Sequence, residues 1–411
     1  MGMAKRFASP TMDERHGALA AERQLKMARS AHAYVRGATQ KFYEWLDLAG
    51  AHDLPEGPPV WICGDCHLGN LGPVASAEGR VDIQIRDLDQ TVIGNPAHDL
   101  IRLGLSLATA ARGSDLPGVT TAHMLEEMMA GYHQALADGD KEALAATAAA
   151  RQPKSIKAVL ARSVGRRWRN LARERIEDAR PRIPIGRRFW NLHDGERDEI
   201  AALFSTETVR RMVTGLKSRD DASPVEVLDA AYWMKGCSSL GRLRYAVLVA
   251  VGGGKDAGAG FCLVDIKEAA PSAAPRAPGA VMPRDNAERV VAGAKALSPY
   301  LGDRMLPARL RDRGVVLREL LPQDLKLEID TLSREEAMQA ARYLGAVVGK
   351  AHGRQMDAST RTRWRDELGR RWPKGLDAPF WLWLSVVDLV GSHEAAYLEH
   401  CRRHALGAQA A

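Results

Sequence analysis

Cysteine is scarce in this chain, with five residues among 411, and their number is odd. So few thiols argue against a disulfide framework and suit a reducing compartment. No apolar run reaches the roughly 18–20 residues that a membrane-spanning helix needs. The charged N-terminus is not followed by the apolar stretch of a secretory signal. We therefore expect a cytoplasmic protein without a membrane segment.

The composition that remains is that of an ordinary globular protein. Hydrophobic residues make up 45% of the chain and charged residues 27%, which is enough for a sizeable core. A chain of this length predicts two or three domains or one large two-lobed unit. The formal net charge of +7 is compatible with an anionic ligand, although charge governs association and says little about fold.

Hydrophobic periodicity along the chain predicts an α+β fold. The expected order is helices at 13–34 and 39–49, short strands at 60–63 and 81–85, helices from 96 to about 150, a helix at 195–218, a β-rich section at 223–321, and helices at 335–352 and about 380–400. Within the β-rich section, the apolar runs 243–251 and 261–266 flank a glycine-rich segment, which predicts a hairpin.

Three polar residues near the predicted short strands have a spacing typical of phosphoryl transfer. Asn70 follows Asp65 by five residues, as in the kinase catalytic loop, and Asp87 ends the next strand. Phosphoryl transfer requires a positioned hydroxyl and neutralised phosphate charge. A carboxylate can accept the hydroxyl proton, and an amide oxygen and a second carboxylate can hold Mg²⁺. Taken alone, Asp65 and Asn70 have a simpler interpretation as two polar loop residues.

The sequence of the loop carries a more specific signal. Residues 64–70, Gly-Asp-Cys-His-Leu-Gly-Asn, resemble the Gly-Asp-x-His-x-Gly-Asn loop of aminoglycoside and choline phosphotransferases. Asp87 and the later block 94–100 resemble the next part of those enzymes, in the same order. The resemblance implies that Asp65 is the catalytic base and that Asn70 and Asp87 hold Mg²⁺.

The same resemblance implies supporting roles for three neighbours. Asp99 would hold the catalytic loop from the following helix, His67 would brace the loop, and Asp89 is a weaker candidate for a metal contact. The chain departs from the pattern at Cys63, where those enzymes carry His, and at Leu88-Asp89, where they carry Phe-Gly. Neither change removes a reacting group, but both leave the geometry of the loop open.

A kinase-type site also needs a lobe that holds the nucleotide, and its signals lie downstream. Gly236, Ser239 and Gly241 resemble a glycine-rich phosphate loop that leads into a strand. Lys267 ends the return strand, like the strand lysine of kinases, and Glu288 on the next predicted helix is its expected ion-pair partner. Simpler interpretations are a β-turn, a surface lysine and a solvated helix face. The order of these residues along the chain favours the nucleotide lobe.

The succession of parts resembles a circularly permuted protein-kinase-like fold, in which the catalytic helical lobe comes first. We expect the first part of that lobe at 1–222, with its catalytic loop at 61–72 and its metal-binding segment at 81–99. A β-rich nucleotide lobe would follow at 223–328, and helices at 329–411 would complete the catalytic lobe. Permutation requires the chain ends to approach one another, which folded domains often permit.

As a family, the chain resembles the bacterial proteins with domain of unknown function 2252 over nearly its full length. The segments that carry this resemblance are 26–30, 34–37, 64–72, 87–89 and 264–269. The resemblance implies a fold more firmly than a substrate. It implies that Arg36 lies near the active site and contacts phosphate, with a surface salt bridge as the alternative.

The expected activity is ATP- and Mg²⁺-dependent transfer of phosphate to an unidentified hydroxyl of a small molecule or protein. Two alternatives keep the fold, namely a nucleotide-binding pseudokinase and a nucleotidyl transferase. A third alternative is a nucleic-acid-binding protein that uses the basic segment 151–190, with Trp168 and Phe189 as stacking groups. Basic helices are more often solvated faces, so nucleic acid is not the expected partner. Nothing in the sequence indicates an oligomeric state.

Overall fold

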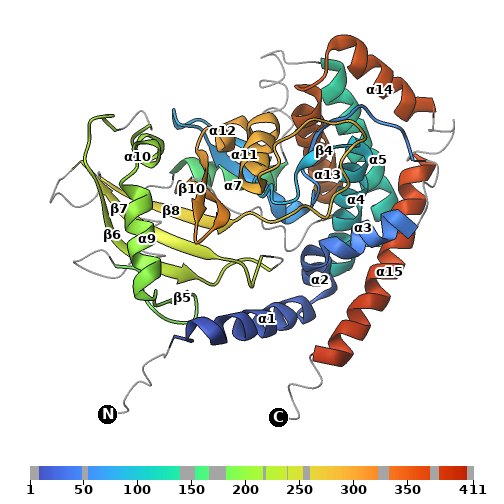
Figure 1. The fold of residues 1–411 in the computed structure, drawn as a ribbon. Helices are drawn as coiled ribbons and strands as arrows, with labels where there is room; N and C mark the ends of the chain where they lie inside the picture. Colours follow the sequence, from blue (N-terminus) through green and yellow to red (C-terminus); the bar gives the residue numbers. More distant parts are fainter. Residues whose placement is uncertain are drawn as a thin grey trace.

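The computed structural model describes residues 9–48, 54–138, 153–165, 182–215, 219–237, 239–252, 260–322, 333–370 and 379–404. It confirms the α+β class, because most helices gather on one side of the molecule and a six-stranded sheet forms the other (Figure 1). Among the described helices, none combines the length and the apolar character that a bilayer crossing requires.

Among the described residues, three helices precede the loop at 61–72: α1 (Met12–Ala28), α2 (Ala31–Gly37) and α3 (Thr39–Leu48). Thr11 and Glu14 form a capping box at the start of α1, and Ser30 caps α2. These caps satisfy backbone N–H groups that a helix start leaves free. In Figure 1, α1 runs below the sheet toward α2, and its Leu19 belongs to the apolar cluster of the sheet. The first helix therefore connects the two sides of the molecule.

Four short strands form two antiparallel pairs around the loop: β1 (Val60–Ile62) with β4 (Val92–Gly94), and β2 (Leu71–Ala75) with β3 (Val81–Ile85). The strands predicted at 60–63 and 81–85 are therefore confirmed. A 3-10 turn, η1 (Leu68–Asn70), leads into β2. Helix α4 (Pro96–Gly113) begins where a Pro in its first turn and an Asn95 cap predict a helix start.

The helical side is completed by α5 (Gly118–Asp138), α7 (Lys154–Gly165), α13 (Arg334–Gly353), α14 (Ala358–Arg370) and α15 (Phe380–His404). Helices α5 and α13 cross with their backbones almost in contact. A Cβ added at Gly345 would collide with the carbonyl of Met128, and one at Gly131 with the carbonyl of Arg342. Glycine at these positions lets α13, which is distant in sequence, pack into the helical core.

The sheet consists of β5 (Phe189–Trp190), β6 (Val225–Trp233), β7 (Arg244–Val251), β8 (Phe261–Glu268), β9 (Met305–Leu310) and β10 (Arg313–Leu320). Its strand order is β5-β6-β7-β8-β10-β9, and every neighbouring pair is antiparallel. Strands β7 and β8 confirm the predicted hairpin. Helices α9 (Asp194–Phe204) and α10 (Glu207–Thr214) pack on the sheet through Ile200, Phe204 and Val209.

The sheet side begins well before residue 223, where the sequence predicts the β-rich section. β5, α9 and α10 all precede that residue, yet β5 pairs with β6 and both helices share the apolar cluster of the sheet. Phe189 of β5 is buried and stacks on Trp233, with ring centroids 5.5 Å apart. It is therefore a core residue and is not available to stack on bases, which removes one of the two stacking groups of the nucleic-acid alternative. Trp168 and the part of the basic segment at 166–181 lie outside the described residues.

Two helices, α11 (Asn286–Leu297) and α12 (Pro299–Gly302), lie between the sheet and the helical side (Figure 1). The connection from β8 to α11 crosses to the segment between β3 and α4. Ser272 Oγ donates a hydrogen bond to the Gln90 carbonyl at 2.7 Å, and Ala277 N–H donates to the Ile93 carbonyl at 2.8 Å. This crossing ties the sheet to the segment that carries Asp87.

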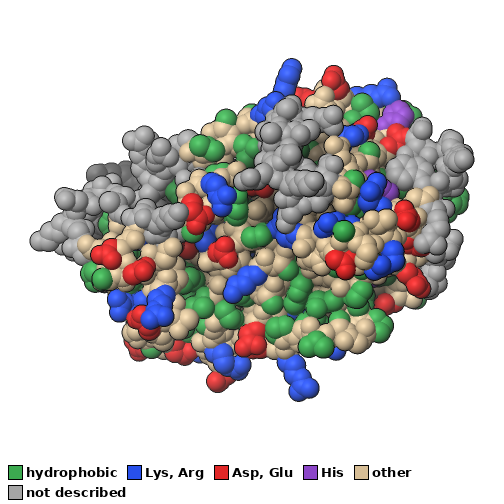
Figure 2. Space-filling model, turned by 90° about the horizontal axis from the view of Figure 1, so that it is seen from above, with side chains coloured by type: hydrophobic (Ala, Val, Ile, Leu, Met, Phe, Trp, Pro, Cys, Tyr) green, Lys and Arg blue, Asp and Glu red, His purple; other side chains and the backbone are tan. Residues whose placement is uncertain are grey.

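Charged side chains of both signs alternate on the face shown in Figure 2. On this face, the described residues form no broad patch of a single charge sign. A nucleic-acid interface would require such a basic patch.

Candidate functional site

Asp99, in the first turn of α4, fixes the start of the predicted catalytic loop. Its carboxylate accepts hydrogen bonds from the backbone N–H of Cys63 at 2.7 Å and of Gly64 at 2.9 Å. His352 of α13 lies 3.2 Å from the same carboxylate through Nε2. Gly64 has a φ of +72°, a left-handed conformation that glycine adopts without strain. These bonds confirm the loop-holding role expected of Asp99.

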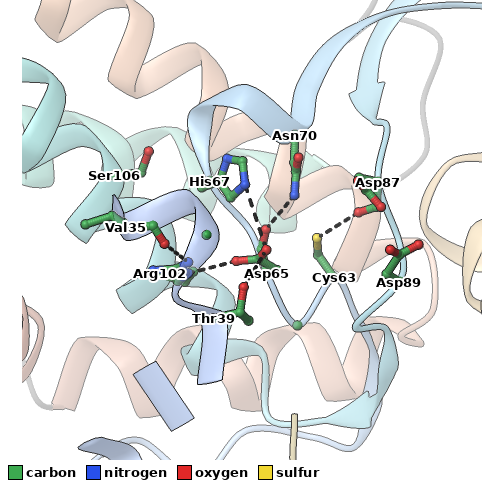
Figure 3. Close-up of polar contacts among 12 residues, drawn as sticks. Val35, Thr39, Cys63, Asp65, His67, Asn70, Asp87, Asp89, Arg102 and Ser106 are labelled. Atoms are coloured by element: carbon green, nitrogen blue, oxygen red, sulfur yellow. Dashed lines mark hydrogen bonds and ion pairs between the residues drawn. The ribbon is translucent and has the colours of Figure 1, made fainter. Parts of the chain in front are cut away.

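Asp65 is buried between two side chains from α3 and α4 (Figure 3). Its Oδ1 accepts a hydrogen bond from Arg102 Nε at 2.9 Å, and its Oδ2 accepts one from Thr39 Oγ1 at 2.9 Å. Only 7% of the residue is exposed. Burial raises the pKa of Asp65, while the charge of Arg102 and the bond from Thr39 partly counteract it. An oriented carboxylate with a raised pKa suits a proton acceptor.

Asn70 is oriented by a bond that returns to the start of the loop. Its Nδ2 donates to the backbone carbonyl of Asp65 at 3.0 Å. The turn η1 makes this reach possible, since the Asn70 N–H bonds the His67 carbonyl at 2.8 Å. Because the amide nitrogen makes this bond, the amide oxygen is the atom of Asn70 that could bind a metal ion. The five-residue spacing of Asp65 and Asn70 thus has a structural basis.

Lys267, near the end of β8, meets the segment after β3. Its Nζ lies 3.2 Å from Asp87 Oδ1 and 2.5 Å from Asp89 Oδ2. Burial alone would raise the pKa of Asp87, but the charges of Lys267 and Arg244 outweigh burial and hold this pKa well below its usual range. The pKa of Asp89 is raised, first by burial and then by the charge of Asp87. Two acids thus share one ammonium group but differ in how readily they ionise.

A cleft opens between the sheet and the helical side at this ion pair. Its lining comprises Arg86, Asp87, Leu88, Asp89, Arg244, Asp265, Lys267, Glu268, Ala269, Val290, Leu301, Met305, Val316 and Arg318. Arg244, which pairs in register with Lys267 across β7 and β8, forms a two-point ion pair with Asp265 at 2.9 and 2.5 Å. Asp87 and Lys267 therefore line one shared cleft, whereas Asp65 and Asn70 are not among its described lining residues.

The predicted glycine-rich loop joins β6 to β7, and two of its glycines have left-handed conformations. The φ angle is +95° at Gly236 and +100° at Gly241. Ser239 Oγ would stand 2.5 Å from a Cβ at position 236, so a larger residue there requires rearrangement. Among the described residues that line the Lys267 cleft, none comes from this loop, and Gly241 lines a second groove on the sheet side. Contact of the loop with phosphate stays a prediction.

Glu288 does not reach Lys267, and the expected ion pair between them requires correction. Glu288 is exposed in the first turn of α11. In the described part of the chain, Lys267 pairs with the two aspartates instead. The reason is helical phase, because the next residue, Arg289, faces inward and donates to the Asp89 carbonyl at 3.1 Å.

Sequence reasoning missed the residues that position the acids. Arg102 and Arg244 are both buried, and each pairs with an aspartate that was not recognised as its partner. The sequence does contain a sign that these arginines are buried, because each one interrupts or borders an apolar stretch of a helix or strand. A charged residue on a buried face requires a buried partner. Asp89, expected only as a weaker metal contact, makes the shortest bond to Lys267.

Among the described residues, no group of three or more His, Cys, Asp or Glu side chains forms a metal site. Asn70 and Asp87 are the residues whose chemistry fits Mg²⁺. Amide and carboxylate oxygens are hard donors, and Mg²⁺ commonly takes its other ligands from water and substrate phosphates.

Comparison with known proteins identifies one family. Neither a curated protein nor a solved structure matches the chain. The model of a family described as "uncharacterized protein conserved in bacteria (DUF2252)" matches residues 15–403. This match includes the loop at 61–72, the Lys267 strand and α13, so the chain as a whole belongs to the DUF2252 family.

Proposed function

We propose that this protein is an ATP- and Mg²⁺-dependent phosphotransferase with a circularly permuted, protein-kinase-like arrangement. One observation carries the proposal: Lys267 and Asp87, 180 positions apart in sequence, meet in a single cleft. Asp65 and Asn70 lie on the neighbouring loop, where the carboxylate of Asp65 is oriented by Arg102. A base, two metal-ligand candidates and a phosphate-binding lysine are thus available together.

The order of parts within the sheet supports the likeness to kinases. A turn with two left-handed glycines joins β6 to β7, the lysine follows on β8, and α11 precedes β9 and β10. Protein kinases use the same succession of glycine-rich loop, strand lysine and helix to hold a nucleotide. The arrangement is permuted because the catalytic loop precedes this sheet in the chain.

Asp65 would accept the proton of the acceptor hydroxyl. Arg102 and Thr39 hold both of its oxygens, so the carboxylate enters the reaction already oriented, which lowers the reorganisation that catalysis requires. Mg²⁺, held by Asn70 and Asp87, would neutralise phosphate charge. Lys267 would contact the nucleotide phosphates from the opposite wall of the cleft.

Asp89 would take the positioning role that the sequence suggested for Glu288. Its contact with Lys267 is shorter than that of Asp87, at 2.5 Å against 3.2 Å. The backbone carbonyl of Asp89 is held by Arg289 of α11. The helix therefore supports the lysine indirectly, through an aspartate of the catalytic segment, and Asp87 remains the acid for the metal.

Two measurements test this function. The first is a thermal shift with ATP and Mg²⁺, where we expect stabilisation of the protein by ligand binding. The second compares ATP labelled at the γ or the α phosphate, with cell extract as the source of acceptor. Transfer of the γ label supports phosphotransfer. Transfer of the α label indicates a nucleotidyl transferase, binding without transfer indicates a pseudokinase, and absence of any shift contradicts all three.

A further inference from the structure

Arg36 places a positive charge beside the loop at 61–72, and this charge has no counter-ion in the described part of the chain. Arg36, near the end of α2, forms no hydrogen bond or ion pair with a described residue, and its Nε is buried without a partner among them. The other arginine at this loop, Arg102, is neutralised by Asp65 at 2.9 Å. A buried polar group without a partner requires an explanation.

The guanidinium of Arg36 lies directly on the catalytic loop. A Cβ added at Gly69 would stand 3.0 Å from the Cζ and Nε atoms of Arg36 and 3.1 Å from its Nη2. Glycine is therefore what permits the arginine to approach here. Gly69 lies between His67 and Asn70, so Arg36 is adjacent to the groups that surround the catalytic base.

Three further nitrogen atoms near this loop also lack partners. His32 Nδ1, His67 Nδ1 and Arg102 Nη1 are buried and form no hydrogen bond with any residue that the structure describes. His32 precedes Arg36 by four residues, which places both on one face of α2. Burial lowers the pKa of His67, and the charges of Arg102, Arg36 and His32 lower it further. His67 is only 3% exposed and Arg102 is fully buried.

We infer that Arg36, together with His32 and His67, forms an anion-binding site for the phosphate acceptor, which would carry a carboxylate or phosphate group near its reacting hydroxyl. This inference rests on the proposed function. Arg36 fits such a group because a guanidinium offers several N–H donors in one plane.

The position of the site favours the acceptor over the nucleotide. In Figure 3, Val35, which precedes Arg36, lies on one side of Asp65, and Asp87 and Asp89 lie on the other. Arg102 makes the link on the first side, since it donates to both the Asp65 carboxylate and the Val35 carbonyl. Lys267 makes its contacts on the second side. An acceptor anchored at Arg36 would place its hydroxyl at Asp65, between the anchor and the nucleotide.

The first test measures binding of inorganic phosphate by calorimetry to protein saturated with Mg²⁺ and a non-hydrolysable ATP analogue. We expect Arg36→Gln to weaken phosphate binding by about tenfold or more, since it removes a charged hydrogen-bond donor. Arg36→Lys should recover part of the affinity. Arg29→Gln is the matched control, because Arg29 is exposed at the end of α1, and it should bind as the wild type does.

Each other outcome decides the question. Equal phosphate binding by the wild type and by Arg36→Gln overturns the inference. The inference also fails if Arg36→Gln loses affinity for the ATP analogue while its affinity for phosphate is unchanged. If the wild type binds no analogue, the proposed function fails. In that case phosphate is titrated into the Lys267→Met protein and into the double variant that also carries Arg36→Gln. Weaker phosphate binding by the double variant still supports the anion site. Equal phosphate binding by the two proteins rejects it.

The second test concerns the acceptor itself. Cell extract is separated on an anion-exchange resin, and the retained and unretained fractions are offered as acceptor with γ-labelled ATP. An anionic acceptor should be found in the retained fraction, and Arg36→Gln should raise its KM more than it lowers kcat. Full acceptor activity in the unretained fraction contradicts an anionic acceptor even if transfer is observed.

Discussion

The two aspartates at the centre of this protein, Asp65 and Asp87, have opposite surroundings. Asp65 is enclosed by Arg102 and Thr39, both from the first 102 residues, and burial raises its pKa. Asp87 keeps 44% of its side chain exposed, and its main partner, Lys267, comes from the sheet. The attraction of Lys267 and Arg244 lowers the pKa of Asp87.

This difference indicates a division of tasks. The surroundings of Asp65 are complete within one section of the chain, so its carboxylate is oriented by the helical side alone. The surroundings of Asp87 exist only when the sheet and the helical side are packed together. A base benefits from a fixed position, whereas a phosphate-binding ion pair gains from lying where a cleft opens.

The largest expected effect comes from removing the proposed base, Asp65. Asp65→Asn should lower the rate of γ-phosphate transfer by about 10²–10⁴-fold, because the amide cannot accept the hydroxyl proton. Transfer of labelled phosphate measures the rate. Asp47→Asn, on an exposed position of α3, should retain the wild-type rate. A folded Asp65→Asn protein with the full rate contradicts the assignment of the base.

The pH profile tests the same residue by a different measurement. Because the pKa of Asp65 is raised, the base loses activity by protonation at a higher pH than an ordinary aspartate near 3.9. The acidic limb of kcat/KM should therefore lie above that value. A limb at or below it indicates that a different group accepts the proton.

The next largest effect is expected at Lys267, the main partner of Asp87. Lys267→Met should lower the transfer rate by about 10²-fold, since it removes a charged group from the developing phosphate charge. It should also weaken binding of ATP, measured by calorimetry. Lys295→Met removes an exposed lysine from α11 and should change neither quantity. A folded Lys267→Met protein with the wild-type transfer rate and ATP affinity would show that Lys267 takes no part in the site.

A third variant tests how the sheet side of the cleft is held. Asp265→Asn leaves buried Arg244 without its counter-ion and should lower the free energy of unfolding by about 3 kcal/mol, measured with urea. The pKa of Asp265 is lowered to about 2, because Arg244 and Lys235 outweigh burial. Its stabilisation is thus fully present above about pH 4 and is lost as the pH falls toward about 2. The difference between the two proteins should narrow over that range.

The smallest effects compare two acids that could support Lys267. Asp89→Asn should weaken ATP binding by about tenfold, because it removes a charged hydrogen bond to the lysine. Glu288→Gln should stay within about twofold of the wild type, since the side chain is exposed. Calorimetric titration with ATP and Mg²⁺ measures both. The opposite ranking would restore Glu288 as the positioning acid.

Much of the candidate site could be predicted because its signals are local. The loop at 64–70 needs a glycine at 64 for its left-handed turn and an asparagine at 70 for the bond to Asp65. Both requirements appear as fixed letters at fixed spacings. The alternation at 81–85 and the proline at 96 likewise predicted a strand and a helix start that the structure confirms.

The errors came from features that depend on the packing of distant segments. Glu288 was expected to face the cleft, but a rotation of one residue around α11 turns Arg289 inward instead. The early strand β5 was assigned to the helical lobe, because its two residues give no sign that they pair with β6. Neither feature can be seen in the local sequence, because each depends on which distant segment packs against it.

By itself, the sequence determined the α+β class, the hairpin of β7 and β8, and a loop whose glycines and polar residues have the order of a phosphotransferase site. These features follow from hydrophobic period and from the backbone conformations that glycine and proline permit. Tertiary structure alone decided that Lys267 meets Asp87 and Asp89, that Arg102 holds Asp65, and that Arg36 has no counter-ion among the described residues. Electrostatic attraction acts over a few ångströms in space, so partners far apart along the chain become visible only when the segments between them are folded.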